Sequence, residues 1–316
     1  MKQSVLITGG AGYLGSVLVE YLLGNGYSVT VLDNLMYKQT SLLHYCDVGD
    51  FNFIKGDVTD KTTLQALVAA HDVIIPLAAI VGAPACDTNP DLTVKVNLNQ
   101  IKDIVDILEP TQKLIMPNTN SQYGSSKDII TEDSPQNPLS LYAKTKCEAE
   151  QYILNSKTRN NGICLRLATV FGASPRMRTD LLVNDFVYKA MTEGVLVLFQ
   201  SQFKRNYIHV RDIARTFLFC IENYDKMNGE VFNVGLSKAN LNKKELAEAI
   251  KEYFPKLVIL ENDFSSDFDN RDYIVSNDKL ESYGWRPIHS IEAGIIELRK
   301  AYSMVIADNN KKYTNL

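Results

Sequence analysis

The chain has 316 residues, a length typical of two domains or of one large α/β domain with an appended smaller one. Lys and Arg number 33 against 37 Asp and Glu, a formal net charge of −4, so no overall attraction for nucleic acid or anionic lipid is expected. No apolar run approaches the roughly 18 residues that cross a bilayer, and no signal-peptide pattern opens the chain, which predicts a cytoplasmic protein. The five cysteines and four histidines are too scattered for a disulfide framework or a metal site.

The N-terminal half alternates between strand and helix patterns. Short apolar runs predict strands at residues 4–8, 28–32, 51–54, 72–76, 113–116 and 163–167. Helical spacing of apolar residues predicts helices at 12–23, 59–70, 91–108 and 139–156. This alternation predicts an α/β fold, a Rossmann-type doubly wound parallel sheet with helices on both faces.

The pattern becomes irregular after residue 172. Helical spacing occurs at 180–191 and 243–253, and strand-like runs occur at 207–210 and 231–234. We therefore predict a Rossmann domain over residues 1–172, with segments near 205–235 returning to it. Residues 173–316 are expected to form mainly a smaller C-terminal α/β substrate domain.

A glycine-rich turn joins the first predicted strand to the first predicted helix. Gly9, Gly12 and Gly15 have the spacing G-x-x-G-x-x-G, which permits a tight turn, admits a pyrophosphate to the helix N-terminus and allows close packing. Asp33 ends the second strand, where a carboxylate accepts hydrogen bonds from both adenosine ribose hydroxyls and repels a 2′-phosphate. The N-terminal domain is therefore predicted to bind NAD rather than NADP.

A tyrosine and a lysine share one face of the predicted helix 139–156. Tyr142 and Lys146 are four residues apart, and a nearby ammonium lowers the pKa of a phenol. Tyr142 is then a candidate general base for a sugar hydroxyl while a hydride passes to the nicotinamide. Such a pair alone also fits a solvated helix face, but its position after the dinucleotide turn favours catalysis.

These residues resemble the extended short-chain dehydrogenase/reductase family that acts on nucleotide sugars, over about residues 5–287. The resemblance makes Thr119, four residues before Tyr123 of a Tyr-Gly pair, the residue that orients the reacting hydroxyl. It makes Tyr142 the base, and Lys146 the group that lowers its pKa and holds the nicotinamide ribose. The implied cofactor-binding residues are Gly9, Gly12, Tyr13, Leu14, Gly15, Asp33, Asn34, Asp57, Val58, Leu77, Ala78, Ala79, Asn97, Tyr142 and Lys146. Asp57 alone equally fits a turn.

The substrate half carries cations suited to a diphosphate, because a guanidinium fork binds phosphate oxygens in pairs. Arg205 and Arg271 lie in segments similar to those in which the family binds the diphosphate, and two further arginines lie close by. The expected substrate-binding residues are Ser121, Thr169, Arg176, Arg178, Asn184, Arg205 and Arg271. Taken singly, each arginine also fits a surface salt bridge.

The family includes 4-epimerases, 4,6-dehydratases, decarboxylases and 4-oxidoreductases. In the dehydratases of the family, the positions of Asn120 and Ser121 are occupied by Asp and Glu. Elimination of water needs an acid and a base, and neither Asn120 nor Ser121 can supply one at neutral pH. Ser121 likewise replaces the glutamate of the decarboxylases and the cysteine of the 3,5-epimerising members. A 4-dehydrogenase or a 4-epimerase remains, unless a base elsewhere, such as His209 or Asp133, takes part.

Segments 117–124 and 167–186 resemble bacterial GDP-heptose 4-dehydrogenases of capsule biosynthesis. The resemblance implies oxidation of GDP-D-glycero-D-manno-heptose at carbon 4; a 4-epimerase with tightly bound NAD is the alternative. A non-catalytic NAD-sensing protein is more remote, because the Tyr–Lys pair is intact. The resemblance also implies a homodimer through the helices 91–108 and 139–156.

Overall fold

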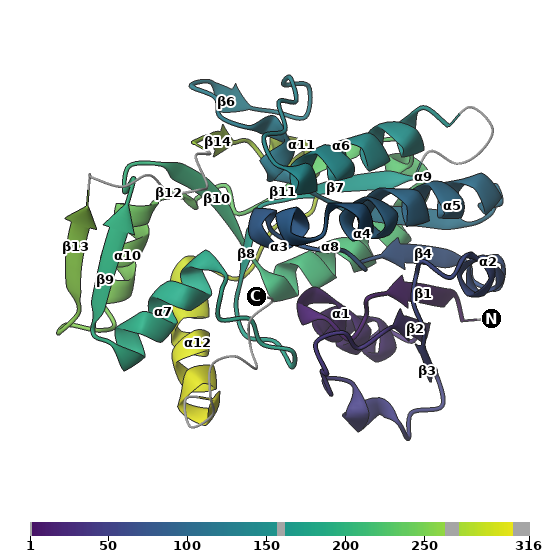
Figure 1. The fold of residues 1–316 in the computed structure, drawn as a ribbon, viewed down its shortest axis with the longest axis horizontal. Helices are drawn as coiled ribbons and strands as arrows, with labels where there is room; N and C mark the ends of the chain where they lie inside the picture. Colours follow the sequence, from purple (N-terminus) through teal and green to yellow (C-terminus); the bar gives the residue numbers. More distant parts are fainter. Residues whose placement is uncertain (1, 157–161, 263–271, 306–316) are drawn as a thin grey trace.

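A computed structural model describes residues 2–156, 162–262 and 272–305. Its centre is a seven-stranded parallel sheet in the order β11-β7-β5-β4-β1-β2-β3, which confirms the Rossmann-type prediction (Figure 1). The strands are β1 (Ser4–Thr8), β2 (Ser28–Asp33), β3 (Phe51–Lys55), β4 (Val73–Pro76), β5 (Lys113–Thr119), β7 (Ile163–Leu167) and β11 (Val231–Val234).

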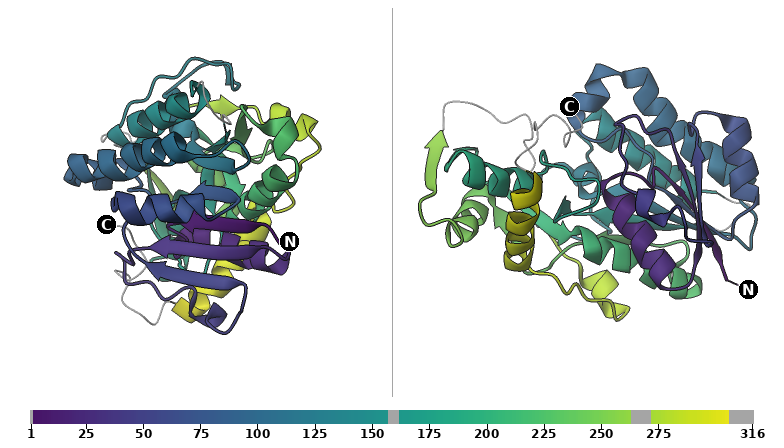
Figure 2. Two further views of the ribbon diagram at one scale, coloured as in Figure 1. Left: turned by 90° about the vertical axis from the view of Figure 1, so that its right-hand side faces the viewer. Right: turned by 90° about the horizontal axis from the view of Figure 1, so that it is seen from below.

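Helices cover both faces of this sheet (Figure 2). One face packs against α1 (Tyr13–Gly24) and α8 (Val210–Glu222). The other packs against α2 (Lys61–Ala69), α5 (Gln100–Ile107) and α6 (Leu141–Leu154). Along β1, Val5 and Ile7 face the first layer and Leu6 the second, so the three central residues of the strand are all apolar.

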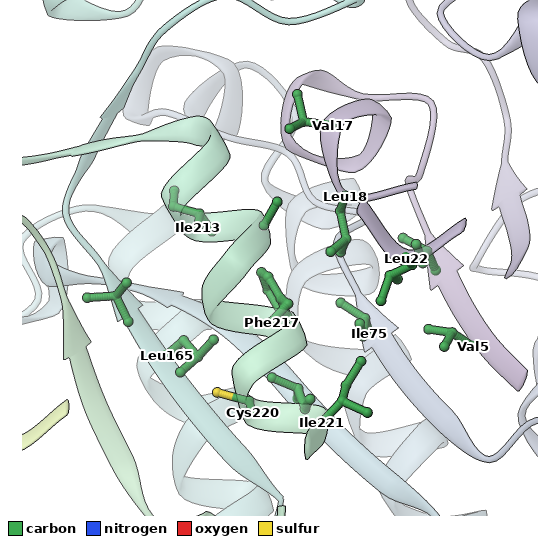
Figure 3. Packing of buried hydrophobic residues seen from close by; sticks show 14 of the residues in the cluster. Val5, Val17, Leu18, Leu22, Ile75, Leu165, Ile213, Phe217, Cys220 and Ile221 are labelled. Carbon is green, nitrogen blue, oxygen red and sulfur yellow. The ribbon is translucent and has the colours of Figure 1, made fainter. Parts of the chain in front are cut away.

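The contact between α8 and α1 closes the first layer. Figure 3 shows Phe217 of α8 on the side of that helix toward Leu18 and Leu22 of α1, near Ile75 of the sheet, and Ile213 on the other side of α8 within the same core. All five side chains are fully buried, and each contributes about 1.5–3 kcal/mol to folding through removal of apolar surface from water. Residues beyond 172 therefore complete the core of the large sheet.

The C-terminal elements build a second layer of structure (left in Figure 1). A three-stranded sheet has the order β12-β10-β8, and β13 pairs with β9 in parallel. The elements are β8 (Thr169–Phe171), α7 (Leu182–Thr192), β9 (Val195–Phe199), β10 (Lys204–His209), β12 (Asn240–Asn242), α10 (Lys243–Lys251), β13 (Val258–Asn262) and α12 (Ile291–Val305). Two short helices, α9 (Tyr224–Met227) and α11 (Asp278–Ser282), pack instead against the large sheet, where Tyr224, Met227 and Leu280 join its core. The domain division at residue 172 stays a prediction.

Several predicted elements have different bounds. The helix predicted at 91–108 is interrupted: α4 (Pro90–Val94) and α5 flank a π-helical turn, η2 (Lys95–Asn99). The helix predicted from residue 59 begins at Lys61, because the Asp60 carboxylate caps it by accepting from Thr62 N and Thr63 N. The short elements η1 (Leu43–Tyr45), α3 (Ala83–Thr88), η3 (Asn120–Tyr123), β6 (Ile129–Ile130) and β14 (Ile274–Val275) were not predicted.

No helix within the described ranges combines the length and apolar character needed to cross a bilayer.

A carboxylate on α12 ties that helix to the end of β10. Glu297 accepts hydrogen bonds from the Ala173 backbone N–H (3.0 Å) and Arg211 Nε (3.3 Å), and its Oε2 lies 2.7 Å from His209 Nε2. Burial opposes ionisation of Glu297, but the His209 hydrogen bond, the backbone donor and the nearby positive charges outweigh it and lower its pKa to about 2.

This depressed pKa predicts an acid-sensitive contribution to stability. The contribution is present above the ordinary value of 4.5 and is lost as the pH falls toward 2, because the unfolded chain then binds the proton more readily. We expect the stability difference between wild type and Glu297→Gln, measured by urea unfolding, to shrink between pH 6 and pH 3. The exposed Glu292→Gln on the same helix is the matched control; a pH-independent difference would contradict the prediction.

Candidate active site

A cavity of about 1440 Å³ lies at the carboxyl ends of the large sheet's strands, where β1, β2, β4 and β5 end. This is the edge at which open α/β sheets bind ligands. The opposite wall comes from β8, the loop after it, α7 and β10. The cavity is thus shared between the large sheet and the C-terminal elements.

The glycine turn forms one end of this cavity. Gly9 has φ +70°, and a Cβ there would lie 2.7 Å from the backbone N and Cα of Ala78. A Cβ on Gly15 would lie 2.6 Å from Gly10 Cα. Gly12 precedes the first turn of α1, whose leading N–H groups have no partner within the helix. Backbone donors and bare glycines at a helix N-terminus fit a dinucleotide diphosphate.

The Asp33 carboxylate lies in the cavity wall at the end of β2. It accepts hydrogen bonds from Ala11 N (3.0 Å), Leu35 N (2.8 Å) and Gln39 Nε2 (3.2 Å). Burial raises its pKa against the effect of the two backbone donors. The carboxylate is thus fixed where the adenosine ribose hydroxyls of NAD would bind.

Asp57 lies beside it in the wall, and Asn34 Nδ2 donates to Asp57 Oδ2 at 2.9 Å. Burial favours the neutral form of Asp57, but hydrogen bonds from Asn34 and Thr59 outweigh it and lower its pKa. Asn97 is placed differently: its side chain is buried and bonds Ile80 N (2.8 Å) and Ile80 O (2.9 Å). Among the described residues, every expected cofactor residue except Asn97 lines the cavity.

The tyrosine–lysine pair also lies in the wall. Helix α6 begins after Ser140, whose Oγ accepts from Ala143 N, so the half-buried Tyr142 stands in the first turn. Lys146 is 4% exposed and its Nζ donates to Pro117 O at 3.1 Å. Burial lowers the pKa of Lys146 to about 8, so the ammonium still prevails at neutral pH. A buried cation one helical turn from a phenol stabilises the phenolate.

Thr119 ends β5 and reaches the same cavity. Its hydroxyl donates to Ser121 Oγ (2.9 Å) and accepts from Ser121 N (3.1 Å). The structure therefore brings Thr119, Tyr142 and Lys146 into one wall, opposite the C-terminal elements. Ser121 lines the cavity beside them.

A buried cluster around Glu150 of α6 fixes that helix against β7, through an ion pair with Arg166, and against β5, through Asn118. The Glu150 carboxylate accepts hydrogen bonds from Arg166 Nη2 (2.6 Å) and Asn118 Nδ2 (2.7 Å), and from Gln122 and Gln136. Asn118 Nδ2 also donates to Lys146 O, and Asn118 Oδ1 accepts from the Thr119 N–H. Breaking a buried pair of this kind costs about 3–5 kcal/mol, so the relative placement of α6 and the end of β5 is rigid.

The expected substrate residues divide into three groups. Ser121, Thr169, Arg176, Arg178 and Arg205 line the cavity. Asn184 is fully buried outside its wall, where its amide accepts from Gly172 N and donates to Arg178 O. Arg271 lies outside the described residues.

The two other candidate bases are not in the cavity wall that the described residues form. His209 is buried against Glu297, and Asp133 is exposed elsewhere. The wall also contains residues that the sequence did not indicate, among them Tyr37, Asp185, Lys243 and Tyr273. Tyr37 follows Asp33 by four residues, which is the one local signal that could have indicated it.

Comparison with known proteins assigns the family. Residues 5–235 match the profile of the NAD dependent epimerase/dehydratase family, so the chain belongs to that family and NAD is its cofactor. This confirms the resemblance to the extended short-chain dehydrogenase/reductases that act on nucleotide sugars, whereas the resemblance to GDP-heptose 4-dehydrogenases stays a prediction. When bound, NAD would lie between the glycine turn and Asp33 at one end and Tyr142 and Lys146 at the other.

The relatives catalyse different reactions. The chain is similar to the low-salt glycan biosynthesis protein Agl12 of Haloferax volcanii (28% identical over 303 residues, 93% of this chain and 96% of the relative). It is also similar to UDP-N-acetyl-alpha-D-glucosaminuronate decarboxylase of Bacillus cytotoxicus (28% identical over 269 residues, 80% of each chain). The solved UDP-glucuronic acid 4-epimerase of Bacillus cereus, in complex with UDP-glucuronic acid and NAD, has the same fold (TM-score 0.83, 24% identity, 96% of this chain and 99% of that one).

Proposed function

We propose that the protein oxidises carbon 4 of a nucleotide-linked sugar with NAD, and that GDP-D-glycero-D-manno-heptose is the preferred substrate. The observation that supports NAD-dependent oxidation is that Thr119, Tyr142, Lys146 and the glycine turn line one cavity. The choice of GDP-heptose rests on the sequence resemblance of segments 117–124 and 167–186. The product is a 4-keto sugar nucleotide for capsular or surface polysaccharide synthesis. A homodimer through α4–α5 and α6 and a cytoplasmic location remain predictions.

The residues of the wall divide the work. Thr119 orients the 4-hydroxyl, and the Tyr142 phenolate removes its proton, since the Lys146 ammonium stabilises the phenolate. Bound NAD supplies a hydride acceptor at the nicotinamide. Arg205, Arg178 and Arg176 offer guanidinium groups to diphosphates at the opposite wall, where Arg178 is held by Asp180 at 3.1 Å (Nε to Oδ1).

Hydride transfer at carbon 4 alone fits the wall better than elimination or decarboxylation. Ser121 cannot serve as an acid or base at neutral pH, and Asn120 is buried outside the wall. His209 and Asp133, the other candidates, are also outside it. The same wall fits a 4-epimerase equally well. In a 4-epimerase the keto sugar rotates and is reduced on its other face, and several relatives are named 4-epimerases.

Incubation with GDP-heptose and with UDP-hexoses, following both NADH absorbance and sugar stereochemistry, separates these functions. A dehydrogenase gives net NADH or a 4-keto product, and an epimerase gives an inverted sugar without net redox change. We expect 4-keto product from GDP-heptose. Formation of an inverted UDP-hexose alone would show a 4-epimerase in place of the proposed 4-dehydrogenase. The absence of a reaction with any sugar nucleotide would refute both functions.

A further inference from the structure

The loop after β8 is fastened to the first turn of α1. Ser174 Oγ donates to Tyr13 O (2.6 Å) and contacts Ser16 Oγ (3.0 Å), while Tyr13 Oη donates to Gly172 O (2.7 Å). This loop belongs to the wall assigned to the sugar nucleotide. Its attachment nevertheless places it beside the helix N-terminus that fits the diphosphate of NAD.

Arg176 follows two residues later in this loop. Its side chain is buried, its backbone N–H donates to Ser174 Oγ (3.3 Å), and its guanidinium lies 4.9 Å from the centre of the Tyr37 ring. Burial, and then the charge of Arg178, lower the pKa of Arg176. Arg178 is paired with Asp180 (Nε to Oδ1, 3.1 Å), so the attraction for an anion at this part of the cavity wall is assigned to the Arg176 guanidinium.

Tyr37 approaches from the other side of the cavity, in the loop after β2. Its backbone N–H donates to Gln39 Oε1 (3.1 Å), and Gln39 Nε2 donates to Asp33 Oδ1 (3.2 Å). Ser41 Oγ donates to Ala11 O (2.7 Å), so the same loop is also fastened to the glycine turn. The Tyr37–Arg176 contact therefore joins the loop that carries Asp33 to the loop after β8, across the expected cofactor site.

We propose that Tyr37 and Arg176 form a clasp that closes over the diphosphate of bound NAD and retains the cofactor between turnovers. Arg176 then binds the cofactor, not the sugar nucleotide. The binding step needs only the NAD site, whereas its consequence rests on the proposed function: NADH formed by oxidation of carbon 4 stays on the enzyme until a keto sugar accepts the hydride back, which regenerates NAD and the sugar hydroxyl.

The test measures cofactor retention without any sugar. The NAD(H) content of purified protein and the rate of NADH release, by stopped-flow fluorescence, are compared for wild type, Tyr37→Leu, Tyr37→Phe and Arg176→Met. We expect about tenfold faster NADH release for both Tyr37→Leu and Arg176→Met. Tyr37→Leu loses the cation–π contact, and Arg176→Met loses that contact together with the positive charge of the guanidinium. Tyr37→Phe keeps the ring and should release NADH at the wild-type rate, and the double variant should be no faster than Arg176→Met.

Two surface variants serve as controls. Lys38→Asn changes an exposed residue of the same loop and keeps a residue type that tolerates its φ of +53°. Arg286→Ala removes an exposed arginine far from the cavity. Both should retain NAD(H) as wild type does. If Arg176→Met fails to fold, the rates of NADH release from Tyr37→Leu and Tyr37→Phe test the clasp on their own.

Release of NADH at the wild-type rate by Tyr37→Leu and Arg176→Met would overturn the clasp. So would weaker binding of GDP to Arg176→Met with unchanged cofactor retention, because Arg176 would then belong to the substrate. Failure of the proposed function is a separate result: wild-type protein that retains NAD but converts no sugar nucleotide.

Discussion

Replacing Tyr142 by Phe is expected to lower kcat by about 10³-fold, within the range that a positioned general base contributes. The ring keeps its place in the first turn of α6, so NAD content and thermal stability should stay at the wild-type level. The lower kcat is then caused by the missing proton acceptor and not by a change in the shape of the cavity. Turnover is measured as NADH or keto-sugar formation with the best substrate found.

The matched control is Tyr152→Phe. Tyr152 lies on the same helix, outside the cavity wall, with its hydroxyl donating to Asp106 Oδ1 at 2.6 Å. Full activity of Tyr152→Phe beside inactive Tyr142→Phe is the expected pair of results. Full turnover by Tyr142→Phe would falsify the catalytic assignment.

Gly9→Ala is expected to abolish tight NAD binding. Alanine at φ +70° costs about 1–2 kcal/mol, and displacing the Ala78 backbone from a Cβ only 2.7 Å away costs about 1–3 kcal/mol more. Both segments line the cofactor end of the cavity, so the strain is expected to weaken NAD binding about 100-fold, to lower Tm, or both. Calorimetric titration with NAD and thermal unfolding measure the two effects.

Gly49→Ala provides the comparison, because nothing lies within 4 Å of a Cβ at Gly49 and its φ is not positive. This variant should bind NAD and unfold as the wild type does. Unchanged NAD affinity together with unchanged Tm in Gly9→Ala would contradict the steric account of the turn.

The sequence was most informative where one local pattern determines the structure. The central residues of β1 are consecutive apolar residues because both faces of the strand are covered, and the glycine turn has a fixed spacing. The same kind of signal was present but overlooked in α8, where Ile213, Phe217 and Cys220 recur at helical spacing. These elements were therefore predictable in principle.

Contacts between distant segments left no such signal. Asn97 and Asn184 have the chemistry of ligand-binding residues, yet each satisfies backbone groups brought near it only by folding. The contact between Arg176 and Tyr37 joins residues that are 139 positions apart in the sequence. Spacing along a chain cannot indicate such pairs.

The buried Glu150–Arg166 pair has a consequence for how this scaffold diversifies. A shift of α6 against β5 and β7 would leave the buried Glu150 carboxylate without its donors, so substitutions that move this wall should be strongly destabilising. Leu181, Leu182 and Thr169 of the facing wall are only partly buried and take no part in that cluster. New sugar preferences should thus arise by exchange of those residues, while the proton-transfer apparatus is inherited unchanged.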